Sequence, residues 1–219
     1  MTLSQTEENY IKAIHTLTQE DLEGTSTNAV ADKLEIKPAT VSAMLIKLKD
    51  KKLIHYEKYC KIRLTVTGLK TAMHVIRKHR IWELFLVDKL GFAWDEVHEV
   101  AEQLEHIQSE KLVDKLDALL GFPKVDPHGD PIPDKDGRMP VISKKPLSEI
   151  NTGKQCKVVG TKDSSPAFLK YLTQMQMELS TKIKVLELVE FDSSMILEVN
   201  GKKVTVSSKV AENLLVSSM

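Results

Sequence analysis

The sequence has little cysteine and no long apolar run, and both shortages narrow what the protein can be. Only two cysteines occur in 219 residues, Cys60 and Cys156, so they can form neither a disulfide framework nor a CxxC zinc site. No apolar stretch approaches the roughly 20 residues that a membrane-spanning helix needs, and no signal peptide is recognisable. The composition therefore predicts a soluble, cytoplasmic protein without a membrane partner, with one large or two small domains.

A net charge is also missing, because 31 basic residues balance 31 acidic ones. The overall charge therefore does not point to nucleic acid. The balance is uneven along the chain, however, since residues 25–70 hold ten Lys and Arg against four Asp and Glu. A basic segment on an otherwise neutral protein is typical of phosphate contacts, which makes this segment the candidate DNA-binding region.

The familiar catalytic motifs are absent as well. The sequence contains no HExxH helix, no paired ExxH motif of a carboxylate-bridged metal site, no nucleophile elbow and no Gly-rich phosphate loop. A metalloenzyme is therefore the weakest of the alternatives, and we expect no enzyme.

What the sequence does have is a concentration of histidines and carboxylates between residues 79 and 106. If residues 94–107 form one helix, four of these side chains fall within an arc of roughly 100° beside an apolar stripe. The residues are His79 and Glu83, followed by His98, Glu102, Glu105 and His106. Nitrogen and carboxylate ligands without thiolate suit manganese, ferrous iron or zinc. The alternative is a solvated, Glu-rich helix face, which is the commoner explanation for any single pair.

The first third of the chain predicts a winged helix. Helical patterns occupy 4–19, 25–36 and the stretch from residue 37, where Pro38 suits a first helical turn. An alternating segment follows and predicts a β-hairpin of 53–57 and 61–66 that closes at Lys58–Cys60. The outer face of the third helix would carry Lys37, Pro38, Ala39, Thr40, Ser42, Ala43 and Lys47. Two short helices and a basic hairpin indicate DNA binding, with protein contacts as the alternative use of such a fold.

The remainder of the chain predicts a helical region, a linker and a β-rich domain. Helices are expected at 69–90, 94–107 and from residue 110 to Gly121. Residues 123–146 hold six of the eight prolines and predict an irregular linker. Short alternating strands with an Asn200–Gly201 turn then favour a small SH3-like β-barrel. The expected class is α+β, with domains at 1–70 (winged helix), 71–122 (helical metal-binding and dimerisation), 123–146 (linker) and 147–219 (SH3-like).

The "RKHR…E" and "VH…E-x-x-EH" patterns on a winged-helix chain resemble metal-dependent repressors of the diphtheria toxin repressor and manganese transport regulator type. The resemblance covers nearly the whole length, including a C-terminal domain similar to FeoA. It implies a homodimeric transcriptional repressor that binds a palindromic operator in double-stranded DNA, with Mn²⁺ or Fe²⁺ as corepressor.

The resemblance also implies site residues. Glu102, Glu105 and His106 match the family's primary metal site, whose ligand from the first helix aligns with Asn9. A Glu found nearby in manganese-type members aligns with Lys12. His79, Glu83 and His98 match the ancillary site, whose further ligands align with Ser164 and Ala167, with Asp163 as a substitute. Asp126 and His128 lie where another branch of the family binds metal in its linker.

One position bears on the choice between Mn²⁺ and Fe²⁺. Iron-type members carry Cys where this chain has Glu102, and a carboxylate in place of a thiolate favours Mn²⁺. Asn9 weakens that preference, because a neutral amide provides less field than a carboxylate. The alternative function is a winged-helix regulator whose DNA binding is controlled by a small organic ligand. Such a protein would need an apolar pocket for the ligand.

Overall fold

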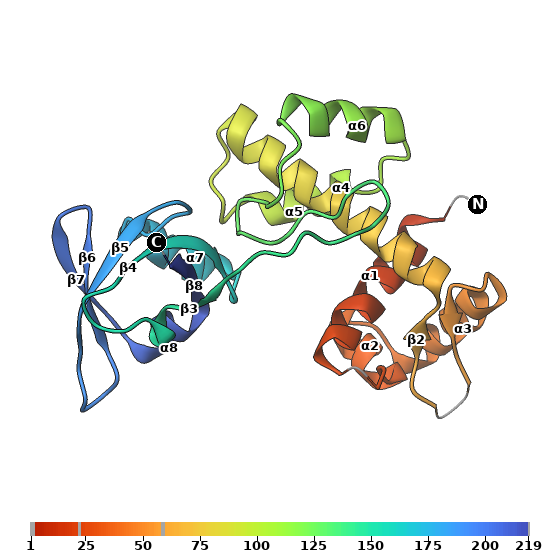
Figure 1. The fold of residues 1–219 in the computed structure, drawn as a ribbon. Helices are drawn as coiled ribbons and strands as arrows, with labels where there is room; N and C mark the ends of the chain where they lie inside the picture. The colour runs from red at the N-terminus through yellow and green to blue at the C-terminus, as the bar shows by residue number, and fades with distance from the viewer. Residues whose placement is uncertain (1–2, 22, 58–59, 219) are drawn as a thin grey trace. The chain divides into compact units, whose positions relative to one another are not determined.

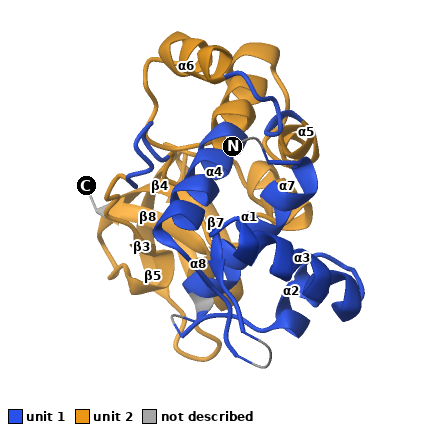
Figure 2. Cartoon of the chain, turned by 90° about the vertical axis from the view of Figure 1, so that its right-hand side faces the viewer, with its two compact units in different colours: residues 1–79, 104–109, 133–139 blue, residues 80–103, 110–132, 140–219 orange. Residues whose placement is uncertain are grey.

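The computed structural model describes residues 3–21, 23–57 and 60–218, which divide into two units (Figure 2). Unit 1 consists of Met1–His79, Leu104–Ser109 and Pro133–Met139, and unit 2 of Arg80–Gln103, Glu110–Ile132 and Pro140–Met219. The long helix α4 contributes its first part to unit 1 and the rest to unit 2. None of the helices described combines the length and the apolarity of a segment that crosses a bilayer.

Unit 1 contains the predicted order of helices and hairpin (Figure 1). The elements are α1 (Gln5–Glu20), α2 (Thr27–Lys33), α3 (Pro38–Asp50), β1 (Ile54–His55), β2 (Arg63–Leu64) and α4 (Val66–Leu90). The two strands pair antiparallel and are shorter than predicted, with Ile54 opposite Leu64. Lys58 and Tyr59 of the predicted hairpin turn lie outside the described residues.

Local sequence explains where α1 begins and how the wing is held. The Ser4 hydroxyl accepts from the Glu7 N–H, and the Glu7 carboxylate accepts from the Ser4 N–H, which is a capping box. In the loop that follows α1, Gly24 has a φ of +110°, and a Cβ at this position would lie 2.7 Å from the carbonyl oxygen of Ile62. Thr25 and Ile62 exchange backbone hydrogen bonds of 3.0 and 2.7 Å. The glycine therefore lets the chain before α2 pair with the start of β2.

The helix predicted at 94–107 is shorter than expected, and this is a correction. Helix α5 runs from Val97 to Leu104, so Glu105 and His106 lie in a turn beyond its end. The Ile107 N–H bonds the Leu104 carbonyl oxygen at 3.1 Å, a tighter turn than an α-helix makes. The single helical arc proposed for four ligands is therefore wrong. Helix α6 (Glu110–Leu119) follows.

Unit 2 contains a six-stranded antiparallel sheet in the order β3-β8-β4-β5-β6-β7, blue and teal in Figure 1. The strands are β3 (Lys145–Pro146), β4 (Gln155–Thr161), β5 (Lys182–Leu188), β6 (Met195–Val199), β7 (Lys202–Val206) and β8 (Leu214–Ser218). Among the described residues β3 and β7 are edge strands, so the predicted barrel is not closed. Strand β3 has only two residues, which is too short for a continuous ladder of hydrogen bonds to β7 at the other edge. Asn200 and Gly201 both have positive φ, as the predicted tight turn requires.

Four elements of unit 2 were not predicted: β3, η1 (Leu147–Glu149), α8 (Ser208–Asn213) and β8. Apolar and polar residues do not alternate along β8, since it begins with three apolar residues, Leu214, Leu215 and Val216. All three are buried. Helix α7 (Pro166–Gln174) was predicted and packs Leu169 and Leu172 into the core that the sheet forms. The linker predicted at 123–146 forms no helix or strand over residues 123–144. Its last two residues form β3 and pair with β8, which corrects the predicted boundary.

Candidate metal centres

A buried carboxylate forms the middle of a polar group in unit 1. Glu105 is fully buried, and its Oε2 lies 2.6 Å from Nδ1 of His79 and 2.7 Å from Nζ of Lys12. The turn after α5 supplies Glu105, α4 supplies His79, and α1 supplies Lys12. Three segments distant in the sequence therefore meet at one carboxylate oxygen.

The next residue of the same turn reaches α1 as well. His106 Nδ1 lies 2.6 Å from Glu8 Oε2, and the other Glu8 oxygen accepts from Gln108 Nε2 at 3.0 Å and from Lys78 Nζ at 3.4 Å. The sequence did not single out Glu8, although Glu8 and Lys12 are four residues apart and so share a helix face. That spacing was the available signal.

Oε1 of Glu105 and Oδ1 of Asn9 are buried oxygen atoms of unit 1 that have no hydrogen-bond partner among the described residues. Nε2 of His106 lies 3.8 Å from that Glu105 oxygen. Buried acceptors without a donor are rare in folded proteins and call for an explanation such as a bound ion. Oxygen and imidazole donors of this kind fit Mn²⁺ or Fe²⁺, so the residues present suit the metals that the resemblance implies.

A second group lies within unit 2 and centres on Glu83, which is buried on α4. His98 Nδ1 lies 3.3 Å from one Glu83 oxygen, and His128 Nδ1 lies 3.7 Å from the other. Glu102 is 3.5 Å from the second nitrogen of His98, one helical turn away on α5. Glu83, Asp126 and His128 can each offer a ligand atom within 4.8 Å of the others, and all three are buried.

The linker residues are held in place by the backbone around them. Nε2 of His128 donates to the Trp94 carbonyl oxygen at 2.7 Å, which leaves Nδ1 facing Glu83. Donation of one ring N–H to a carbonyl is the usual way a metal-binding histidine is oriented. Asp126 Oδ1 accepts from the backbone N–H groups of His128 and Asp130 at 2.8 and 2.9 Å.

Burial and neighbouring charges shift both linker residues in the same direction. Burial, together with Glu83 and Asp130, raises the pKa of the Asp126 carboxyl to about 7. Burial alone would lower the pKa of His128, but Glu83 and Asp126 outweigh it and raise that pKa to about 9. The group therefore attracts positive charge, whether a proton or a cation.

The structure distributes the predicted metal residues between the two units. Unit 1 brings His79, Glu105 and His106 together, and unit 2 brings Glu83, His98 and Glu102 together with Asp126 and His128. Asn9 lies on α1, three residues before Lys12 and thus on a neighbouring part of the same face. Ser164 and Ala167 are exposed, and Asp163 accepts from the Ser165 N–H at 2.8 Å at the start of α7.

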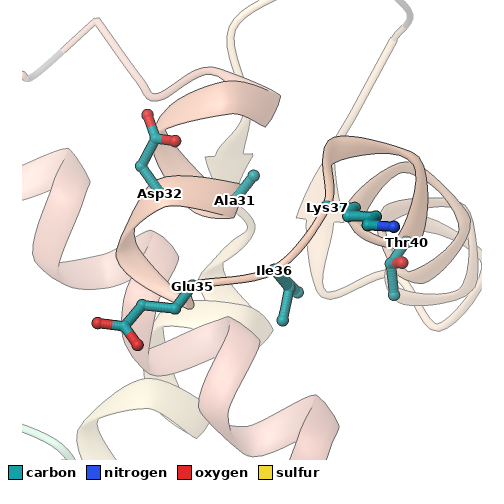
Figure 3. A pocket seen from close by; sticks show the side chains of 6 residues that line it. All are labelled: Ala31, Asp32, Glu35, Ile36, Lys37 and Thr40. Atoms are coloured by element: carbon teal, nitrogen blue, oxygen red, sulfur yellow. The ribbon is translucent and has the colours of Figure 1, made fainter.

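The predicted DNA-reading face lies on α3. Six of its seven residues are exposed and Ser42 is half-buried, with its hydroxyl bonded to the Pro38 carbonyl at 3.1 Å. Figure 3 shows Lys37 and Thr40 at the start of α3, beside an open hollow that is also lined by Ala31, Asp32, Glu35 and Ile36. Glu7 of α1 pairs with two lysines of the same region, at 2.6 Å to Lys51 and 3.1 Å to Lys47.

Comparison with known proteins gives three consecutive family matches. Residues 2–62 match the N-terminal DNA-binding domain of iron-dependent repressors, and residues 65–134 match their metal-binding and dimerisation domain. Residues 145–218 match the FeoA domain. Together these matches follow the predicted order of DNA-binding, metal-binding and C-terminal domains.

Individual relatives agree with the family matches. A solved manganese-dependent transcriptional repressor in complex with manganese is 33% identical, with a TM-score of 0.81, and the match covers 97% of this chain and 100% of that one. The iron-dependent repressor IdeR of Mycobacterium leprae is 34% identical over 131 residues, which are 60% of this chain. The diphtheria toxin repressor of Corynebacterium jeikeium is 30% identical over 148 residues, or 68% of this chain.

These two curated relatives are longer than the segments that match, which span 56% and 61% of their lengths. The manganese-dependent repressor, by contrast, is matched from end to end at an identity that sets the family. The chain therefore belongs to the family of metal-dependent transcriptional repressors that includes the iron-dependent and manganese-dependent repressors.

Proposed function

We propose that this protein is a transcriptional repressor that binds DNA when a divalent metal, Mn²⁺ or Fe²⁺, occupies its metal centres, and that it controls metal-ion homeostasis. The observation that carries the proposal is that two consecutive residues of α1, Glu7 and Glu8, contact α3 and the metal group respectively. Glu7 pairs with Lys47 and Lys51 at the end of α3, whereas Glu8 pairs with His106 in the metal group. Ordering of α1 at the metal group thus acts directly on the helix that reads DNA.

We propose two sets of ligands. In unit 1, Asn9, His79, Glu105 and His106 would hold one ion, with Glu8 either bound directly or orienting His106. In unit 2, Glu83, His98, Asp126 and His128 would hold another, with Glu102 beside them. A bound divalent ion would supply positive charge and directional bonds that draw oxygen and nitrogen ligands together. The contact of His106 with Glu8 would then hold α1 in position, and the ion pairs of Glu7 with Lys47 and Lys51 would hold α3 against α1.

We propose further that the repressor is a homodimer acting in the cytoplasm on palindromic double-stranded DNA, and that it is not an enzyme. Exposed apolar side chains on and after α6 support the dimer: Leu112, Leu119 and Phe122. The dimer axis would place two α3 helices in successive major grooves. The functional domains are proposed at 1–70, 71–122, 123–146 and 147–219, the last of SH3-like class with an open sheet.

The alternative, a regulator that answers to an organic ligand, draws little support from the hollow beside α3. Asp32, Glu35 and Lys37 line it alongside two apolar side chains. Organic ligands usually bind in enclosed pockets lined mainly by apolar groups. This hollow is open and carries two carboxylates and an ammonium group, so it does not have the character of such a pocket.

The test is operator binding followed by fluorescence anisotropy, with a palindromic duplex selected from random DNA by the metal-loaded protein. Binding is expected with Mn²⁺ or Fe²⁺ and loss of binding with excess chelator. His106→Ala should abolish the metal response, because it removes a ligand from the turn after α5. Glu99→Ala, which changes an exposed carboxylate on α5, is the matched control and should respond normally. Equal DNA affinity in metal and in chelator would refute the proposal.

A further inference from the structure

A positively charged side chain lies inside the unit 1 group, among the proposed metal ligands. Nζ of Lys12 is 2.7 Å from Glu105 Oε2 and 3.4 Å from His79 Nδ1. Only 20% of the Lys12 side chain is exposed, and the Glu105 side chain is fully buried. An ion pair so placed is screened by salt far less than a pair on the surface.

Among the residues that the structure describes, two carboxylates of this group already have ammonium partners without a metal. Its two carboxylates, Glu8 and Glu105, each have one ammonium partner, Lys78 at 3.4 Å and Lys12 at 2.7 Å. A buried carboxylate that lost its partner would destabilise the fold, because its desolvation would no longer be offset. Lys12 therefore stabilises the metal-free protein by keeping Glu105 paired.

We propose that Lys12 is an internal counter-cation that competes electrostatically with the metal and so raises the metal concentration at which the protein responds. The inference rests on the proposed function, since it concerns the same site. An ion bound at Glu105 brings two positive charges close to the Lys12 ammonium group, and like charges at such distances repel strongly in a buried site. Lys12 thus lowers metal affinity without being a ligand.

The counter-cation role and a purely structural role predict opposite signs for one substitution. If Lys12 only supported the fold, Lys12→Met would weaken both the fold and the binding of Mn²⁺. If Lys12 competes with the metal, Lys12→Met should lower the melting temperature of the metal-free protein and yet tighten Mn²⁺ binding by about tenfold or more. Lys12→Arg keeps the charge and should leave Mn²⁺ affinity near that of the wild type.

The experiment is calorimetric titration of the 219-residue chain with MnCl₂ alone, together with thermal unfolding in chelator. Lys12→Gln, which is neutral but can still donate a hydrogen bond, is the second variant if Lys12→Met does not fold without metal. Tighter Mn²⁺ binding by the neutral variant and not by Lys12→Arg supports the inference. If the wild type binds Mn²⁺ and the operator but neutral variants bind Mn²⁺ no tighter, only the counter-cation role is overturned. If the wild type does not bind Mn²⁺, the proposed function falls as well.

Discussion

At the scale of the residue, Glu7 on α1 is a buried carboxylate whose pKa is strongly shifted by its neighbours. Burial raises its pKa, but the Lys51 ammonium, the Ser4 N–H and the Lys47 ammonium together lower that pKa from the usual 4.5 to about 2. The folded protein thus favours the charged form. Its stabilising effect is complete above a pH of about 4.5 and is lost as the pH falls toward 2.

Glu7→Gln should therefore lower the free energy of unfolding by about 1–3 kcal/mol at neutral pH. The difference from the wild type should shrink as the pH falls below about 4.5, since the wild-type carboxyl then also becomes neutral. Urea unfolding at neutral and acidic pH measures both quantities. Glu23→Gln, at an exposed carboxylate, is the control and should change little. A difference that stays constant with pH would show that the charge of Glu7 is not responsible.

Asn9 provides a second test at the residue scale, because its Oδ1 is buried without a hydrogen-bond partner among the described residues. If this oxygen is a metal ligand, Asn9→Asp should tighten Mn²⁺ binding by adding a charge, and Asn9→Ala should weaken it. Titration of each variant with Mn²⁺, followed by operator anisotropy, measures the effect. An unchanged response in both variants would leave Glu8 as the residue through which α1 senses metal.

At the scale of the element, substitutions on α3 test whether its proposed DNA contacts position the protein or read the sequence. Lys37→Ala should weaken binding to every duplex and reduce the slope of log affinity against log salt by about one unit. Lys47→Ala should have a smaller effect, because Glu7 already neutralises that lysine. Thr40→Ala should instead change which sequence is preferred. Anisotropy at several salt concentrations and a selection from random duplexes distinguish these outcomes. A uniform effect of Thr40→Ala on all sequences would contradict its role in readout.

Elements also show what could be predicted from sequence and what could not. The start of α1 was predictable, because Ser4 and Glu7 form a local capping box. The end of α5 was not, because the turn that carries His106 is fixed by Glu8, 98 residues earlier. The last strand was missed because Leu214–Ser218 lies between β3 and β4 with its apolar residues buried on both faces, which removes the alternation that identifies strands.

The same distinction holds for the site. Spacing and resemblance found every histidine of the two groups, since imidazoles are rare enough to stand out. They did not find Glu8, because three residues of one helix face, Glu8, Asn9 and Lys12, compete for the same role and only tertiary contacts decide among them.

At the scale of the whole molecule, metal and DNA must affect each other's binding equally. If Mn²⁺ raises operator affinity by a given factor, operator DNA must raise Mn²⁺ affinity by that factor, with about 5–150-fold as the usual range. Calorimetric titration of Mn²⁺ into the protein with and without operator measures this factor directly. Factors that differ in the two directions would reveal a further equilibrium, such as dimerisation, within the measurement.

The adjacency of Glu7 and Glu8 on α1 has a consequence for cooperativity. The proposed path from the metal group of unit 1 to α3 consists of neighbouring residues of one chain, so it does not require a second copy of the chain. Each subunit of the proposed dimer should therefore respond on its own. The metal-dependent signal of a probe on α1, measured without DNA, should rise along a simple hyperbola with a Hill coefficient near one. Any steepness in the transcriptional response would then arise at the operator, where both subunits must bind together.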